Sequence, residues 1–207
     1  MPDPRPVPDW LTDLMARLER DGLGLERATP SGARSSAVLI LFGEGPYGPD
    51  VLLIQRAADL RRHAGQPAFP GGAAENGDRD AAATAVREAG EETGLDPDGV
   101  MVLGELGPLF IPASGFSVTP VVGWWARRTA VRAVDIDEVA AVSVVPLAEL
   151  ADPARRCRVR YAGSGRTGPG FDLAGMLVWG FTALVLDRLL ETGGWARPWR
   201  PGALREV

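Results

Sequence analysis

The sequence of 207 residues predicts an α/β protein, arranged as an α/β/α sandwich. Two observations carry this prediction. Short segments rich in β-branched and apolar residues recur along the chain at lengths typical of strands. Segments with helical periodicity lie near the N-terminus, in the middle and near the C-terminus. Strands interleaved with helices favour layers of helix, sheet and helix around a common core.

The first part of the chain predicts one helix and two strands. Residues 2–8 are rich in proline and favour an extended chain. The helix that follows is amphipathic, with apolar residues at Trp10, Leu11, Leu14, Met15 and Leu18. Residues 21–34 are interpreted as a loop. Strands are predicted at residues 36–42 and 51–56, separated by a turn-rich break at residues 43–50.

The middle of the chain predicts a basic loop, a helix and three strands. The loop covers residues 57–70. Asp78 or Asp80 can cap the start of the helix, and Gly94 can end it. The strands expected after this helix span residues 100–106, 117–126 and 139–145.

The last part of the chain predicts two helices, a loop and a tail. A short helix is expected at residues 148–150, and a glycine-rich loop at residues 162–175. The final helix is strongly apolar, with Leu177, Phe181, Leu184 and Leu189 among its core residues. Residues 193–207 are expected to form an irregular tail, held against the protein by Trp195 and Trp199.

The most informative segment is residues 71–95, which ends in a cluster of acidic residues. Glu88, Glu91 and Glu92 lie at positions i, i+3 and i+4 of the predicted helix. At about 100° per residue, they point to one side of it. Each exposed pair of like charges at this spacing costs roughly 0.2–0.5 kcal/mol. A hard divalent cation removes this repulsion, since Mg²⁺ commonly binds a few carboxylates together with substrate phosphates.

An ordinary solvated helix face is the competing interpretation, because glutamate is a good helix former. The opposite side of the helix favours a site. Apolar residues follow the helical spacing there, at Ala82, Ala85, Val86 and Ala89. Their stripe is centred about 120° from the glutamates, so the helix can pack on a sheet while its carboxylates face a cleft. The Gly71-Gly72 pair ahead of the helix lets backbone approach a ligand closely.

Gly72, an acid near the helix start and the run Arg87-Glu88-Ala89-Gly90-Glu91-Glu92-Thr93-Gly94-Leu95 resemble the Nudix box of nucleoside diphosphate hydrolases. The chain departs from the usual box in one place. It has eight residues rather than seven between the acid and Arg87, and the acid is Asp78 rather than glutamate. This insertion leaves the role of Asp78 open and keeps the three glutamates in register.

A second motif precedes the box. Leu52-Leu53-Ile54-Gln55-Arg56-Ala57, followed by Arg61, Gly65 and Phe69-Pro70-Gly71-Gly72, is similar to the motif of the coenzyme A pyrophosphatase branch of Nudix enzymes. Only Ile54 departs, where threonine is usual. Weaker similarity continues in residues 137–147 and 176–183. The resemblance covers about residues 35–190.

The resemblance implies a mixed sheet and hydrolysis of a pyrophosphate bond with Mg²⁺ or Mn²⁺. By analogy, Glu88 and Glu92 would bind the metal, and the Gly72 carbonyl would complete its coordination. Glu91 would bind another ion or help to activate water. Arg87 would orient a box glutamate rather than contact substrate.

The resemblance also implies a base and a phosphate-binding loop. Glu138 is the candidate base, since Nudix enzymes often draw an acid from a later loop; an exposed turn residue is the equal alternative. Arg56, Arg61, Arg62 and His63 could bind phosphates on the adenosine side of the substrate. A solvated basic loop is their competing interpretation.

The expected substrate is coenzyme A or a derivative of it, cleaved to adenosine 3′,5′-bisphosphate and 4′-phosphopantetheine. Three alternatives stay open. The first is another Nudix specificity, such as ADP-ribose, NADH or a nucleoside triphosphate. The second is a non-catalytic module that binds a nucleotide, although all the box glutamates are present. The third is a structural protein with a fortuitous acidic helix.

Composition narrows the partners. The net charge of −5 argues against a general nucleic-acid surface. The one cysteine, Cys157, cannot form an intrachain disulfide and fits a reducing cytoplasm. The one histidine, His63, excludes a two-histidine metal site. The longest apolar run, near residues 176–186, is too short to span a bilayer. We expect one domain over residues 1–207, with an N-terminal helix and loop (1–34), a core (35–190) and a tail (191–207). The oligomeric state stays open.

Overall fold

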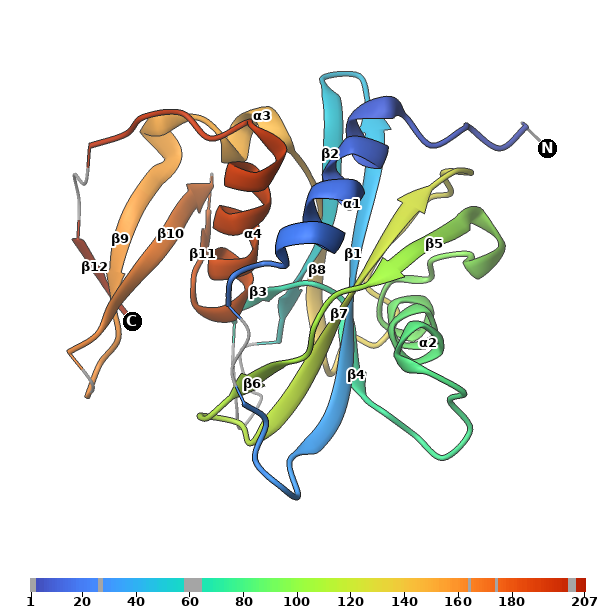
Figure 1. Ribbon diagram of the computed structural model, residues 1–207, viewed down its shortest axis with the longest axis horizontal. Helices are drawn as coiled ribbons and strands as arrows, with labels where there is room; N and C mark the ends of the chain where they lie inside the picture. The colour runs from blue at the N-terminus through green and yellow to red at the C-terminus, as the bar shows by residue number, and fades with distance from the viewer. Residues whose placement is uncertain (1–2, 26–27, 58–64, 164, 174, 201–203) are drawn as a thin grey trace.

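The computed structural model describes residues 3–25, 28–57, 65–163, 165–173, 175–200 and 204–207 (Figure 1). Its largest element is an eight-stranded sheet. The strands are β1 (Arg34–Gly45), β2 (Gly48–Arg56), β3 (Pro67–Ala68), β4 (Gly71–Ala73), β5 (Val100–Glu105), β6 (Leu109–Ile111), β7 (Phe116–Trp125) and β8 (Val139–Pro146).

The large sheet is mixed, as expected. Its main path runs β3-β2-β1-β7-β5, while β4 pairs with β1, β6 with β7 and β8 with β2. Strands β1 and β7 are parallel, with Leu39 opposite Val121. The pairs β1–β2, β2–β8 and β5–β7 are antiparallel. The central position of β1 explains its long apolar run, because both of its faces are covered.

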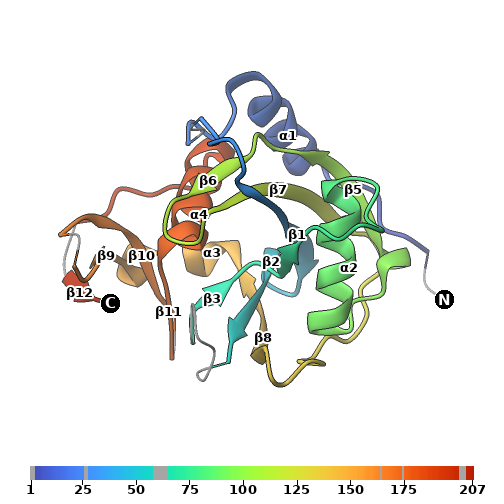
Figure 2. The same cartoon turned by 90° about the horizontal axis from the view of Figure 1, so that it is seen from below.

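Helices cover the two faces of this sheet (Figure 2). Helix α1 (Asp9–Asp21) and helix α4 (Gly180–Gly193) lie on one face, and helix α2 (Ala81–Thr93) lies on the other. The side chains of β1 alternate between them: Ile40 and Phe42 pack with the α1 and α4 side, while Leu39 and Leu41 pack with α2. The predicted sandwich of helix, sheet and helix layers is confirmed.

A second sheet of four strands lies beside α4. Its strands are β9 (Arg156–Arg160), β10 (Thr167–Leu173), β11 (Met176–Val178) and β12 (Leu204–Glu206), in the order β11-β10-β9-β12. Along the chain, the last strand of the large sheet is followed by α3 (Leu147–Leu150) and a 3-10 turn (Pro153–Arg155), which lead into β9. Another 3-10 turn (Pro97–Gly99) precedes β5. Buried side chains of β10 and β11 belong to the same core cluster as α1 and α4. The expectation of one domain stays a prediction.

The second sheet is where the sequence predictions were wrong. The expected loop at residues 162–175 contains β10, because Phe171 and Leu173 alternate with small or polar residues and are buried. Leu177 belongs to β11 rather than to the final helix, which begins at Gly180, where φ is +69°. The expected irregular tail contains β12, which pairs in parallel with β9.

Two other boundaries differ from the predictions. The expected break at residues 43–50 is a tight hairpin, because β1 continues to Gly45 and β2 starts at Gly48. Strand β3 interrupts the expected loop at residues 57–70.

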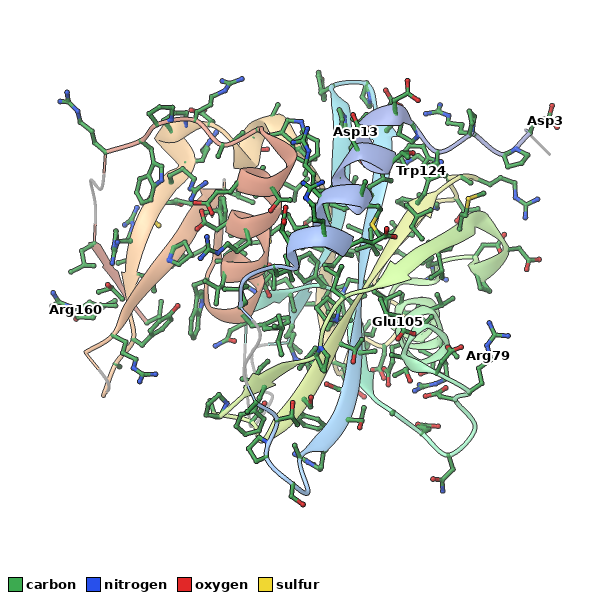
Figure 3. All side chains as sticks on the ribbon, in the orientation of Figure 1. Asp3, Asp13, Arg79, Glu105, Trp124 and Arg160 are labelled. Carbon is green, nitrogen blue, oxygen red and sulfur yellow. The ribbon has the colours of Figure 1, made fainter. Side chains whose placement is uncertain are left out.

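The tryptophans of the tail contact the protein as predicted. Trp195 meets Trp10 of α1 edge-on, with 5.4 Å between ring centroids, and the Trp199 ring lies 5.0 Å from the guanidinium of Arg156. Trp124 of β7, labelled in Figure 3, holds the segment ahead of α1, because its indole N–H donates to the carbonyl of Arg5 at 3.0 Å. Among the described residues, no helix is long and apolar enough to cross a membrane.

Candidate active site on helix α2

Helix α2 is anchored at both ends and along its apolar face. Asp80 rather than Asp78 is the N-cap, and its carboxylate accepts from the Ala83 N–H at 2.7 Å. Glu105 of β5 accepts from another free N–H of the first turn, that of Ala82, at 3.1 Å. Gly94 ends the helix in the left-handed conformation at φ +67°. The predicted alanine stripe packs on the sheet. The side of the helix that carries the glutamates faces strand β4.

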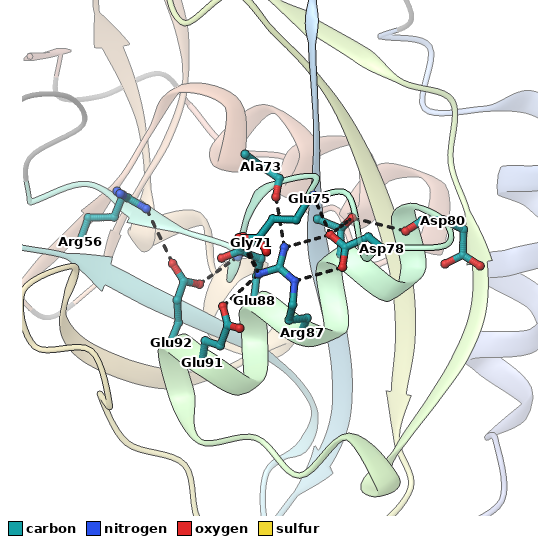
Figure 4. A network of polar contacts seen from close by, with 11 residues as sticks. Arg56, Gly71, Ala73, Glu75, Asp78, Asp80, Arg87, Glu88, Glu91 and Glu92 are labelled. Atoms are coloured by element: carbon teal, nitrogen blue, oxygen red, sulfur yellow. Dashed lines mark hydrogen bonds and ion pairs between the residues drawn. The ribbon is translucent and has the colours of Figure 1, made fainter.

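Glu92 is the most deeply placed of the three glutamates. Only 4% of its side chain is exposed. Its Oε2 accepts from the Gly71 N–H at 2.9 Å, and its Oε1 lies 3.7 Å from a guanidinium nitrogen of Arg56 (Figure 4). Burial raises the pKa of Glu92 to about 7, against the lowering effect of these two partners, and the charges of Glu88 and Glu138 add to the rise.

Glu88 packs its carboxylate against Gly72 of β4. A Cβ atom on Gly72 would overlap the carboxylate of Glu88, so the backbone of β4 touches this side chain directly. Burial also raises the pKa of Glu88, although Arg87 opposes the shift from 3.1 Å. Glu91 is the outermost of the three, with 60% of its side chain exposed.

Arg87 is the hub of the polar network in Figure 4. It donates to both carboxylate oxygens of Asp78, at 3.1 and 3.0 Å, to Glu91 at 3.0 Å and to the Ala73 carbonyl at 3.2 Å. Asp78 also accepts from the Glu75 N–H and from the Thr84 hydroxyl, each at 2.9 Å. The Arg87 guanidinium, with these two donors, holds the pKa of Asp78 well below its ordinary value. Asp78 therefore joins the loop to the helix despite the insertion.

Replacing Asp78 with asparagine should lower the thermal stability of the protein at neutral pH. The folded pKa of Asp78 lies below the unfolded value, so its ionised form stabilises the fold above the unfolded pKa, and this stability is lost as pH falls through the folded pKa. The difference in melting temperature between Asp78→Asn and the unmodified protein should therefore shrink in acid. Melting curves between neutral pH and about pH 3 measure it; a constant difference would contradict the ion-pair explanation.

Two further predicted residues, Arg56 and Glu138, lie close to the glutamates. Glu138 is an exposed residue of the loop before β8, and its charge acts on both Glu88 and Glu92. Its carbonyl accepts from the Ala57 N–H at 2.8 Å, which ties this loop to the end of β2 next to Arg56. The other predicted substrate residues, Arg61, Arg62 and His63, lie outside the described residues.

The donors of this site fit a hard cation only in part. Glu88, Glu92 and the Gly71-Gly72 backbone are all oxygen-bearing groups at one place, which suits Mg²⁺. Within the described ranges, however, no three acidic, histidine or cysteine side chains form a ready metal-binding group. Arg87 and Arg56 hold the glutamates instead. Substrate phosphate oxygens commonly supply the remaining ligands of Mg²⁺, so the residues present are compatible with the ion.

Sequence reasoning missed two contributors to this site. The Gly71 N–H donates to Glu92, whereas only the Gly72 carbonyl was considered. The sequence offers Asp78 only as a possible helix cap and leaves its place in the box open, whereas in the structure it accepts from three donors. The signal for the first was the double glycine, because a side chain at Gly71 would overlap the Ala37 carbonyl of β1 and one at Gly72 would overlap the Glu88 carboxylate.

The fold and the carboxylate cluster on α2 define an α/β sandwich with an acidic helix on one face of its mixed sheet, and comparison with known proteins gives its family. A family model described as the NUDIX domain matches residues 32–161. The chain belongs to this family, whose hydrolases generally use a divalent metal such as Mg²⁺.

The relatives and solved structures are consistent with the family. "Uncharacterized Nudix hydrolase NudL" from Pectobacterium atrosepticum is 51% identical over 116 residues, which cover 56% of this chain and 59% of that protein. The protein of the same description from Escherichia coli K12 is 43% identical over 139 residues, covering 67% and 70%. The chain thus spans less than two thirds of the first relative. The Nudix hydrolase RenU from M. smegmatis has a TM-score of 0.52 at 22% identity, covering 81% of this chain and 90% of that one, which shows the fold alone.

Proposed function

We propose that the protein hydrolyses the pyrophosphate bond of coenzyme A or its derivatives, with Mg²⁺ or Mn²⁺ as cofactor. The products would be adenosine 3′,5′-bisphosphate and 4′-phosphopantetheine, or an acylated form of the latter. The observation that carries this proposal is the contact between the two motifs. Arg56, from the motif similar to that of coenzyme A pyrophosphatases, lies 3.7 Å from Glu92 of the Nudix box. The guanidinium proposed to bind phosphate and the carboxylate proposed to bind metal therefore lie within reach of one ligand.

The proposed chemistry needs charge neutralisation and positioning more than covalent catalysis. A divalent ion, when bound, neutralises charge on the phosphate oxygens and lowers the pKa of water. Glu88, Glu92 and the Gly72 carbonyl would hold it. Gly71 orients Glu92 through its N–H.

The surrounding residues take positioning and proton-transfer roles in this proposal. Arg87 positions Glu88 and Glu91 while Asp78 holds Arg87 in place. Glu138 and Glu91 are the candidates for accepting a proton from the attacking water. Both are exposed, so either carboxylate can exchange its proton with solvent afterwards.

Product analysis with coenzyme A, NADH and ADP-ribose tests the proposal most directly. With Mg²⁺, coenzyme A should be cleaved with the highest kcat/KM, and adenosine 3′,5′-bisphosphate should be released. A clear preference for ADP-ribose or NADH would place the protein with another Nudix specificity. Nucleotide binding without turnover of any of the three would favour a non-catalytic module.

Coenzyme A should be cleaved about ten- to a hundredfold more efficiently than 3′-dephospho-coenzyme A, because a hydrogen bond to a charged group contributes roughly 1.5–3 kcal/mol. The arginines proposed for this phosphate are Arg56, Arg61 and Arg62. Arg61→Ala and Arg62→Ala should narrow the ratio of the two kcat/KM values by weakening coenzyme A more. Equal kcat/KM values in the unmodified protein would refute recognition of the 3′-phosphate, although not the hydrolysis itself.

Replacing Gly72 with alanine should impair hydrolysis more than folding. The new methyl group would overlap the end of the flexible Glu88 side chain, which can move away at small cost to stability. Glu88 would then leave the place proposed for a metal ligand, so kcat/KM should fall by at least about tenfold, equivalent to 1.4 kcal/mol. Steady-state kinetics and melting temperature measure the two effects.

Gly71→Ala is the matched control, because its methyl group would overlap the backbone carbonyl of Ala37, which belongs to the central strand β1. This variant should lose melting temperature as well as activity. If Gly72→Ala instead keeps full activity, the contact between β4 and Glu88 has no part in the site.

A further inference from the structure

The end of strand β2 is shaped to aim Arg56 at the glutamates of α2. The pairing of β2 with β8 shifts register between Gln55 and Arg56. Irregularities of this kind re-aim a side chain and are frequent beside active sites. Two hydrogen bonds fix the backbone directly after the shift: the Arg56 N–H donates to the Gln66 carbonyl at 3.0 Å, and the Ala57 N–H donates to the Glu138 carbonyl at 2.8 Å. The direction of Arg56 is therefore built into the sheet.

Arg56 approaches the one oxygen of Glu92 that the backbone leaves open. The Gly71 N–H occupies Oε2, and the Arg56 guanidinium lies 3.7 Å from Oε1. Figure 4 shows Arg56 on the opposite side of Glu92 from Arg87, which pairs with Glu88 and Glu91. A cation bound at Oε1 of Glu92 would compete with Arg56 for this oxygen. Arg56 is itself 25% exposed, so it can turn toward solvent or a ligand.

We propose that Arg56 is the internal counter-cation of Glu92 in the metal-free protein, and that a divalent cation at Glu92 releases Arg56 to bind a substrate phosphate. The inference rests on the proposed function. A guanidinium and a divalent cation repel each other and compete for the same carboxylate oxygen. Once released, the planar guanidinium suits a phosphate group, to which it can donate two hydrogen bonds.

This exchange couples the metal to the substrate. Without metal, Arg56 is engaged with Glu92 and less available to phosphate, and Glu92 is not left as an unpaired buried charge. With metal, the phosphate-binding cation becomes free. By linkage, phosphate that engages Arg56 must in turn favour metal binding by the same factor.

Titration of Mn²⁺ alone, followed by the electron paramagnetic resonance of the free ion, tests the exchange without measuring activity. Arg56→Gln removes the competitor and should bind Mn²⁺ with a Kd about tenfold lower than that of the unmodified protein. Arg79→Gln is the control for net charge. Arg79 is 84% exposed and pairs with Asp80, which lies at the opposite end of the polar network from Glu92 (Figure 4). The Kd of Arg79→Gln for Mn²⁺ should therefore stay within about twofold of that of the unmodified protein.

Adenosine monophosphate supplies the second measurement. In the presence of Mn²⁺, Arg56→Gln should bind this probe about tenfold more weakly in calorimetry, while Arg79→Gln should not. Opposite effects of one substitution on metal and phosphate are specific to an exchange, because a merely structural role would weaken both. Arg56→Met, which keeps the apolar stem, repeats the test if Arg56→Gln does not fold.

Unchanged or weaker Mn²⁺ binding by the Arg56 variants, in a protein whose unmodified form binds Mn²⁺, would overturn the exchange and leave the proposed function standing. Failure of the unmodified protein to bind Mn²⁺ both alone and together with adenosine monophosphate would overturn both.

Discussion

Removal of divalent cations should abolish hydrolysis of coenzyme A by this protein. The physical reason is the charge at the site: Glu88 and Glu92 are largely buried near each other and near Glu138, and burial raises the pKa of both. Without a dication, these carboxylates repel both one another and an anionic substrate. Turnover should fall to background after treatment with EDTA and return with added Mg²⁺ or Mn²⁺.

Thermal melting provides an independent check on the same site. A ligand that binds only the folded state stabilises it by about 2.7 kcal/mol at a concentration of one hundred times its Kd. Mg²⁺ should therefore raise the melting temperature of the unmodified protein, and chelation of Mg²⁺ with EDTA should return it to the metal-free value. Undiminished turnover after rigorous removal of metal would exclude the proposed role of the glutamates.

The five long strands of the large sheet and helix α2 could be predicted because their signals are local and strong, whereas the short strands β3, β4 and β6 were not predicted. Strand β1 is a continuous apolar run, and α2 has a cap, an apolar stripe and a terminal glycine at the required spacing. The glutamate cluster follows from helical periodicity alone. These features depend on residues within about two helical turns of one another, which is the range over which sequence periodicity is informative.

The second sheet could not be predicted for the opposite reason. Strand β12 has three exposed residues and exists through its parallel pairing with β9, more than forty residues away in the sequence. Strand β10 contains Gly168 and Gly170, and the side chains of Tyr161 and Val159, respectively, pack closely against them. Glycine is common in loops, so close packing was mistaken for a turn.

The role of Asp78 shows the same limit within the site. The extra residue lies between Asp78 and Arg87 in the sequence, and the fold of the chain ahead of α2 nevertheless places the two side chains 3.0 Å apart. Spacing rules describe an average loop. The ion pair depends on where the loop folds back, which only the structure shows.

Glu92→Gln should lower kcat by at least about a hundredfold, equivalent to 2.7 kcal/mol of transition-state stabilisation. Glutamine keeps the shape of the side chain, and its amide oxygen can still accept from the Gly71 N–H. It removes the negative charge proposed to bind the metal. The fold should survive, because only 4% of this side chain is exposed and a neutral amide avoids the cost of burying a charge there.

The control and the stability measurement separate catalysis from folding. Glu19→Gln removes one carboxylate from the exposed side of α1 and should leave kcat unchanged. Because burial raises the pKa of Glu92 to about 7, its ionised form destabilises the metal-free fold as pH rises toward that value. Metal-free Glu92→Gln should therefore melt at or above the unmodified protein at alkaline pH, and the rise in melting temperature with Mg²⁺ should be lost. A kcat within about threefold of the unmodified protein, less than the tenfold that 1.4 kcal/mol would give, would remove Glu92 from the catalytic site.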